Sequence, residues 1–300
     1  MTTRRLLQIG VALALMALLW MRLDGKAALH LLREARPGWL IAALLILSAQ
    51  TLLSAARWRL TARQLGLRIP PSLAVREYYL AQIVNQSLPG GVLGDMGRAV
   101  RSRRAAGLTR AAEAVVIERM AGQAAIFGMM LTAVLAVTLV PGGLGLPTAV
   151  LGLVSAIAAA ILILTLALLY LPGERMRHLR IAVGRSMGRE VLPLQIALSL
   201  GTATANLLAF DACARATGTA LPLSALMVLV PLIITTMLLP ISISGWGLRE
   251  GAAAALFPLA GASSEAGLAA SIAFGLVFLV STLPGIAILL ATTRRRVSRD

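Results

Sequence analysis

Long apolar runs recur along this 300-residue chain, and most are long enough to cross a lipid bilayer. The hydrocarbon core of a bilayer is about 30 Å thick, which a helix of about 20 apolar residues spans. Because lipid offers no hydrogen bonds to an exposed backbone, such runs are expected to cross as helices. Charged residues make up only 13% of the chain, against about a quarter in soluble domains. The sequence therefore predicts an all-α, polytopic integral membrane protein that forms one membrane domain over residues 1–300.

About six runs are predicted to be full spans. They cover Leu6–Met21, Trp39–Ala56, Met120–Val140, Pro147–Leu171, Val191–Phe210 and Ala266–Thr292. The first run follows two arginines but no small-x-small cleavage site comes after it, so we interpret it as an uncleaved span rather than a signal peptide. Two other stretches, Ser72–Ala106 and Leu221–Ala260, are apolar but interrupted by Gly and Pro.

The basic residues predict an orientation. Of those flanking the predicted spans, 21 fall on one side of the membrane and 5 on the other. Since Arg and Lys concentrate in cytoplasmic loops, both termini are expected in the cytoplasm and the location to be the cell (inner) membrane. With this orientation Ser72–Ala106 begins and ends inside, and Leu221–Ala260 begins and ends outside.

Each interrupted stretch is therefore predicted to be a re-entrant helical hairpin, one entering from each face. A broken helix is tolerated at membrane depth only where protein or a wet cavity surrounds it. The chain then divides into residues 1–140 and residues 147–292, two halves of opposite orientation that form an inverted repeat. Such repeats are typical of secondary transporters, with the substrate site between them. Two full spans per hairpin, with no repeat, is the alternative.

The two hairpin tips carry similar residues. Residues 85–95 read NQSLPGGVLGD and residues 240–250 read PISISGWGLRE, with the same spacing from serine to acid. Glycines allow tight turns, and the start of the returning helix favours an anion such as phosphate. The acids at the tips either take part in binding or only cap these helices. The candidate substrate-binding residues are Asn85, Ser87, Gly90, Gly91, Asp95, Arg98, Glu118, Arg119, Ser242, Gly245, Gly247, Arg249 and Glu250.

Several function classes lack support in the sequence. His30 and His178 stand apart, so no His-based metal site or hydrolytic triad is visible. There is no P-loop and no dinucleotide-binding fingerprint, and no cofactor is expected. The net charge of +16 comes from arginines between spans without a recognition motif, so no nucleic-acid partner is expected. We therefore expect a protein that is not an enzyme.

At the two tip motifs, with Arg98 and the Glu118–Arg119 pair, the chain resembles the lysylphosphatidylglycerol synthase transmembrane family, also called the flippase-like or UPF0104 family. The resemblance covers roughly Arg4–Arg296. It implies a polytopic domain that, in bifunctional members, moves aminoacylated phosphatidylglycerol to the outer leaflet. Those members also carry a cytoplasmic aminoacyltransferase domain, which is not seen in these 300 residues, so synthesis of the lipid is not expected.

The resulting hypothesis is a flippase or transporter of an anionic membrane lipid, whose headgroup enters a polar cavity between the hairpin tips. Tip amides, Arg98 and Arg249 would hold its phosphate. Three alternatives stay open: an enzyme acting on lipid-linked substrates, a non-transporting membrane subunit, and a small-anion secondary transporter. The expected partners are an anionic lipid and either a second copy of the chain or a separate lipid-modifying enzyme.

Overall fold

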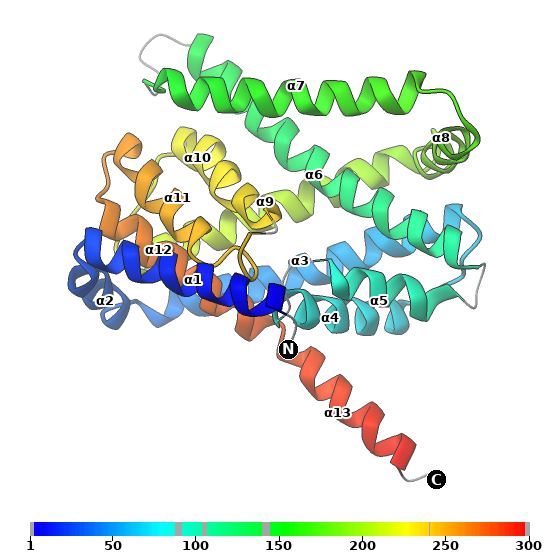
Figure 1. Cartoon of the computed structure of the whole chain (residues 1–300), viewed down its shortest axis with the longest axis horizontal. Coiled ribbons are helices and arrows are strands. Elements are labelled where there is room, and N and C mark those ends of the chain that lie inside the picture. The colour runs from blue at the N-terminus through cyan, green and yellow to red at the C-terminus, as the bar shows by residue number, and fades with distance from the viewer. Residues whose placement is uncertain (1–2, 88–91, 104–106, 140–144, 240, 298–300) are drawn as a thin grey trace.

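A computed structural model describes residues 3–87, 92–103, 107–139, 145–239 and 241–297, and every regular element in these ranges is a helix. Most of the long helices run roughly side by side along the long axis of the molecule (Figure 1). The prediction of an all-α polytopic membrane protein is confirmed: five helices are long and apolar enough to span a bilayer, and a bent pair brings the number to six.

The long helices correspond to the predicted spans. They are α3 (Pro37–Gln64), α6 (Leu108–Leu139), α7 (Thr148–Tyr170), α9 (Leu192–Ala216), and the continuous apolar stretch of α12 (Ser264–Ser281) and α13 (Pro284–Val297). The sixth candidate is α1 (Thr3–Arg22), which bends by 98° into the short α2 (Gly25–Arg33). Asp24 begins α2 by accepting hydrogen bonds from the amides of Lys26 and Ala27, which fixes the bend at this point.

Two helices extend further than hydropathy predicts. α3 continues to Gln64, beyond the predicted end at Ala56, and α6 begins at Leu108 rather than at Met120. The predicted boundaries stop where charges begin, at Arg57 and at the Glu118–Arg119 pair. Those charges neutralise one another inside the bundle, so the helices continue through them. Arg57 is thus not a loop residue, and Glu118 lies in the third turn of α6 with its side chain buried.

The two interrupted stretches form short antiparallel pairs at opposite ends of the bundle. α4 (Pro71–Ser87) and α5 (Leu93–Ser102) lie at the right in Figure 1. At the left lie α10 (Leu223–Thr235), extended by the short η2 (Thr236–Leu238), and α11 (Leu248–Leu256), which is followed by η3 (Phe257–Ala260). None of these helices is long enough to be a candidate span. Re-entry into a membrane stays a prediction, because no membrane is part of the structure.

The order of elements is the same in the two predicted halves. In each half a span leads to a short helix (α2 or α8, Glu174–Ser186), a second span, a helix pair and a last span. α3 and α9, which occupy the same place in this order, pack closely along each other. This order agrees with the repeat over residues 1–140 and 147–292, whose inverted relation stays a prediction.

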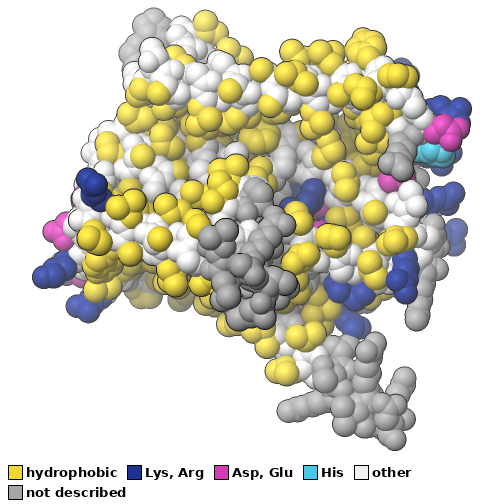
Figure 2. All heavy atoms as spheres, viewed as in Figure 1, with side chains coloured by type: hydrophobic (Ala, Val, Ile, Leu, Met, Phe, Trp, Pro, Cys, Tyr) yellow, Lys and Arg dark blue, Asp and Glu magenta, His cyan; other side chains and the backbone are white. Residues whose placement is uncertain are grey.

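The surface is apolar around the middle and basic at the ends. Large hydrophobic side chains are exposed along α6, α7 and α9, as expected for helices that face lipid. In Figure 2 the Lys and Arg side chains gather mostly at the right-hand end, next to α8, and fewer lie at the left. The core includes Phe210, whose ring centroid lies 5.3 Å from that of Phe274. This core holds α9 and α12 against α10 and α11.

Candidate functional site

A cavity of about 230 Å³ lies between the two helix pairs. Polar side chains from α3, α4, α6 and α9 line much of it, while η2 and α12 supply an apolar wall. In Figure 2 a few basic and acidic atoms show in the middle of an otherwise apolar face. The polar and charged lining residues are Gln50, Ser54, Arg57, Tyr78, Gln82, Asn85, Gln86, Asp95, Glu118, Arg119, Gln123, Thr202, Thr235, Asn206 and Ser244.

Glu118 is the centre of the charged network at this cavity, and its side chain is completely buried. Arg57 donates to its Oε1 from Nε at 3.1 Å and from Nη2 at 2.6 Å. Tyr78 Oη donates to the same oxygen at 3.1 Å, and Arg98 Nη2 donates to Oε2 at 3.1 Å. This carboxylate therefore accepts hydrogen bonds from two guanidinium groups and a phenol, and those from the guanidinium groups are charge-assisted.

Arg98 is stacked between two aromatic rings. Its guanidinium carbon lies 4.5 Å from the ring centroid of Trp58 and 4.5 Å from that of Tyr78. Nη2 donates to Asp95 Oδ1 at 2.8 Å, a pairing that the i, i+3 spacing on one helix allows. The buried Nε and Nη1 atoms have no hydrogen-bond partner, so cation–π contact replaces hydrogen bonding for that part of the group. Arg98 stands behind the cavity wall rather than in it.

Asp95 connects Arg98 to the cavity. Its Oδ2 accepts a hydrogen bond from Asn85 Nδ2 at 2.9 Å and forms an ion pair with Arg119. Arg119 is the most accessible charge here, with 37% of its side chain exposed. Asn85 Oδ1 accepts from the amide of Gly94 at 2.7 Å, so Asn85 caps α5 and Asp95 does not.

The remaining candidate residues of the first tip are Ser87, Gly90 and Gly91. Ser87 ends α4 with an exposed side chain and does not line the cavity. Gly90 and Gly91 lie outside the described residues. The described part of this tip therefore contributes Asn85, Gln86 and Asp95 to the cavity.

A second buried arginine lies on the other side, at the start of α11. Arg249 donates to Glu250 Oε1 from Nε at 3.1 Å and from Nη2 at 2.5 Å, and to Ser271 Oγ from Nε at 3.0 Å. Its guanidinium carbon lies 5.1 Å from the ring centroid of Trp246 and 5.5 Å from that of Phe274. Arg249 and Glu250 are 1% and 0% exposed, and neither lines the cavity.

The second tip is closed by its own hydrogen bonds. The amide of Gly247, at φ +85°, donates to Glu250 Oε2 at 2.7 Å, so Glu250 caps α11. Gly245 has φ +78°, a conformation that glycine adopts without strain. Ser242 is buried, and its hydroxyl has no hydrogen-bond partner. Instead Ser244 reaches the first tip, where its hydroxyl donates to Gln86 Oε1.

In both clusters a glycine on a neighbouring helix lies directly against an arginine guanidinium. Gly122 lies one turn after Glu118 on α6, and a Cβ atom there would come within 2.7 Å of the Arg57 guanidinium. Gly275 lies one turn after Ser271 on α12, and a Cβ atom there would overlap the Arg249 guanidinium. Glycine is required at both positions because the large planar group of an arginine occupies the space.

The cavity cluster has an excess of positive charge. Among the described residues, Arg57, Arg98 and Arg119 form ion pairs with two carboxylates, Asp95 and Glu118, which gives this set of five a formal charge of +1. In an apolar bundle such a charge is only weakly screened and favours an anion. Arg249 and Glu250, by contrast, neutralise each other. Among the described residues no group of three His, Cys, Asp or Glu side chains could hold a metal ion.

Some of the lining residues were not predicted from the sequence. Gln50, Ser54 and Arg57, spaced by four and three residues, form a polar stripe on one face of an apolar helix. Thr202 and Asn206 do the same on α9, and Thr202 Oγ1 accepts from Arg57 Nη1 at 2.8 Å. Such stripes inside a span are the signal by which these residues are recognisable.

Comparison with curated proteins and with solved structures finds no significant match. A family model does match: that of the lysylphosphatidylglycerol synthase TM region, over residues 6–285. The match takes in every helix that lines the cavity and agrees with the resemblance carried by the two tip motifs. The chain is therefore a multi-pass membrane protein that belongs to the lysylphosphatidylglycerol synthase transmembrane family.

Proposed function

We propose that this protein moves an anionic membrane lipid between leaflets, and that the cavity beside Arg119 receives the lipid headgroup. One observation carries the proposal: a polar cavity with excess positive charge lies in the middle of an apolar bundle, between two helix pairs that approach from opposite ends. Membership in a family named for a phospholipid-modifying enzyme supports a lipid as the substrate. Phosphatidylglycerol, aminoacylated or not, is the first candidate.

Arg119 is the group that first meets the headgroup. Its partner Asp95 also accepts from Asn85 at Oδ2 and from Arg98 at Oδ1, so the carboxylate keeps two partners when a phosphate takes its place on Arg119. Charge-assisted hydrogen bonds to the guanidinium then replace the ion pair. The neutral amides of Gln50, Gln82, Gln123 and Asn206 offer contacts to glycerol or sugar hydroxyls. No covalent step is required, and we propose a transporter rather than an enzyme.

The orientation also belongs to the proposal. The Arg-rich end of the bundle, at the right in Figure 2, is assigned to the cytoplasmic side. Both termini are likewise assigned to the cytoplasm and the protein to the cell (inner) membrane. α4 and α5 then enter from the cytoplasmic face and α10 and α11 from the opposite face. The contact between Ser244 and Gln86 joins the two tips in this conformation.

The test is transport by the full chain in liposomes. Fluorescent phosphatidylglycerol is followed between leaflets, with phosphatidylcholine, whose zwitterionic headgroup has no net charge, as the control. Wild-type protein is expected to accelerate movement of phosphatidylglycerol, and Arg119→Gln to abolish most of the gain. Arg177→Gln, on the exposed face of α8, is the matched control and is expected to behave as wild type. Rates equal to protein-free liposomes for every lipid would refute the proposal.

A free small anion is the second candidate, and the modest volume of the cavity favours it as a specific observation. Uptake of radiolabelled phosphate into the same vesicles separates the two. Uptake without lipid movement would assign the cavity to a small-anion transporter.

A further inference from the structure

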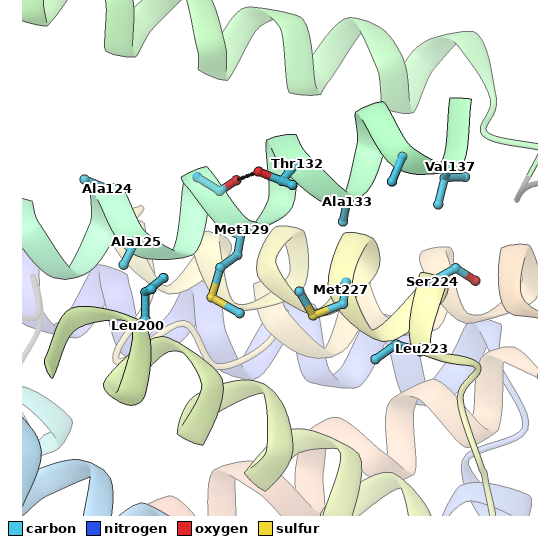
Figure 3. A pocket seen from close by; sticks show the side chains of 12 residues that line it. Ala124, Ala125, Met129, Thr132, Ala133, Val137, Leu200, Leu223, Ser224 and Met227 are labelled. Carbon is cyan, nitrogen blue, oxygen red and sulfur yellow. Dashed lines mark hydrogen bonds between the residues drawn. The ribbon is translucent and has the colours of Figure 1, made fainter. Parts of the chain in front are cut away.

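A second hollow, larger and of opposite character, lies along α6. It measures about 600 Å³ and is bounded by α6, α9 and α10 (Figure 3). Its lining consists of small and aliphatic side chains together with two methionines, Met129 and Met227. In Figure 3 these two point into the space between α6 and α10. We call this hollow the α6 groove.

The α6 groove offers almost nothing to a polar ligand. Thr132 and Ser224 are its only polar side chains, and no charged residue lines it. The Thr132 hydroxyl donates to the carbonyl of Gly128 in its own helix at 2.9 Å, the dashed line in Figure 3. Flexible methionines adapt to irregular apolar shapes. The chemistry of the lining therefore fits a hydrocarbon chain.

The groove and the cavity lie along the same helix, α6, and share no lining residue. On α6, the cavity is lined by residues that include Glu118, Gly122 and Ile126. The residues of α6 that line the groove lie between Ala124 and Val137. Gly122, Met129 and Ala133 follow one another at spacings of seven and four residues, which places them on one side of α6. An acyl chain would reach the groove from the cavity along this side of α6.

The length of the groove also fits. Thirteen residue steps from Ala124 to Val137, at about 1.5 Å each, span roughly 20 Å, the greater part of a hydrocarbon core of about 30 Å. We propose that the α6 groove holds one acyl chain of the lipid whose headgroup lies in the cavity. The inference rests on the proposed function and gives the bound lipid a direction: headgroup near Glu118, chain toward the C-terminal end of α6.

Gly128 allows a clean test. A Cβ atom on Gly128 would meet nothing within 4 Å, so Gly128→Leu is accommodated by the fold and fills the groove. A Cβ atom on Gly152, on the exposed face of α7, also meets nothing within 4 Å, so Gly152→Leu is the matched control. Both changes put the same side chain into an apolar helix, but only one fills the groove.

The probe is phosphatidylglycerol with a photoreactive diazirine on one acyl chain, mixed into vesicles that contain the full-length protein. After illumination, labelled peptides are identified by mass spectrometry. We expect labelling of residues 124–137 and 223–227 to exceed labelling of α7 several-fold. It should fall several-fold in Gly128→Leu and, because the headgroup anchors the chain, in Arg119→Gln. Gly152→Leu should leave it unchanged.

The outcomes separate the two proposals. Specific groove labelling without leaflet transport would support the acyl-chain site and refute the transport proposal. Transport that persists in Gly128→Leu, with equal labelling of the groove and of α7 by phosphatidylglycerol and phosphatidylcholine, would overturn the acyl-chain site alone. Absent groove labelling together with loss of a dimer in Gly128→Leu would assign the groove to a second copy of the chain.

Discussion

The two buried arginine clusters of this protein are built alike but face different surroundings. In each, an arginine is stacked on two aromatic rings and paired with a carboxylate, and a glycine on a span makes room for a guanidinium. The cluster around Glu118 carries a third arginine and opens to the cavity. The cluster of Arg249 and Glu250 is neutral and sealed. In our proposal the same packing unit serves binding on one side, whereas on the other side Glu250 caps α11.

The difference between the two clusters indicates which charged side chains a ligand in the cavity can reach. Arg249 donates to Glu250 and Ser271 within its own cluster, and its Nη1 contacts Met237 Sδ at 3.9 Å. Because the side chain is only 1% exposed and does not line the cavity, an anion there does not reach its charge. Arg119 exposes part of its side chain to the cavity. The sequence hypothesis that Arg98 and Arg249 hold the phosphate therefore gives way, in our proposal, to Arg119 as the contact and Arg98 as the residue that positions Asp95.

The largest expected effect comes from Glu118. Glu118→Gln removes the charge shared by Arg57 and Arg98 and leaves two buried guanidinium groups without a full counter-ion. Breaking a buried ion pair costs about 3–5 kcal/mol, so the apparent melting temperature in detergent is expected to fall sharply. Lipid binding should be lost in the protein that remains folded. An unchanged melting temperature would show that the network does not stabilise the bundle.

The sealed cluster should respond to single and double changes differently. Arg249→Met alone leaves Glu250 buried and unpaired, which costs about 3–5 kcal/mol. The double variant Arg249→Met with Glu250→Leu removes both charges and is expected to regain most of that stability. Thermal unfolding of the three proteins measures the recovery, and lipid transport by the double variant is expected to stay near wild type. Lost transport in a stable double variant would place this cluster in the binding machinery.

Arg119→Gln separates binding from stability. Its half-exposed ion pair with Asp95 contributes no more than about 1 kcal/mol to folding, so the melting temperature should change little. Loss of a hydrogen bond to a charged headgroup costs about 1.5–3 kcal/mol, which corresponds to roughly tenfold weaker binding or more. Titration with short-chain phosphatidylglycerol, with Arg177→Gln as control, measures the difference. Equal affinities would remove Arg119 from the site.

The smallest effect is expected at the contact between the tips. Gln86→Ala removes the acceptor of the Ser244 hydroxyl, a bond worth about 0.5–1.5 kcal/mol. Because this bond holds the two tips together, its loss should increase hydrogen exchange of residues 241–247 more than that of α9. Exchange that rises equally in both segments would indicate global destabilisation instead.

Much of the fold follows from the sequence, since apolar length predicts helices and spans directly. The C-terminal end of α3 and the N-terminal end of α6 do not follow from the sequence. Hydropathy places a span boundary at Arg57 and at Glu118, whereas these two side chains form an ion pair inside the bundle. That pairing joins residues 61 positions apart, and no local pattern encodes it. Only tertiary packing decides that a charge inside a span is compatible with burial.

The candidate site was predictable in part for the same reason. Spacing along one helix correctly pairs Asp95 with Arg98, and sequence similarity of the tips draws attention to Glu250. Similarity of the tips does not distinguish an acid that caps its own helix from an acid that lines a cavity. Glu250 accepts from the amide of Gly247 and is of the first kind, and Asp95 is of the second. The polar stripes on α3 and α9 become meaningful only when the helices that face them are known.

The most direct test of the central claim compares three proteins in one vesicle assay of phosphatidylglycerol movement between leaflets. The account predicts transport by wild type and by the double variant Arg249→Met with Glu250→Leu, and little or none by Arg119→Gln. Transport by all three at the same rate would contradict it, because the charge that opens to the cavity would then be no more important than the charge that is sealed away.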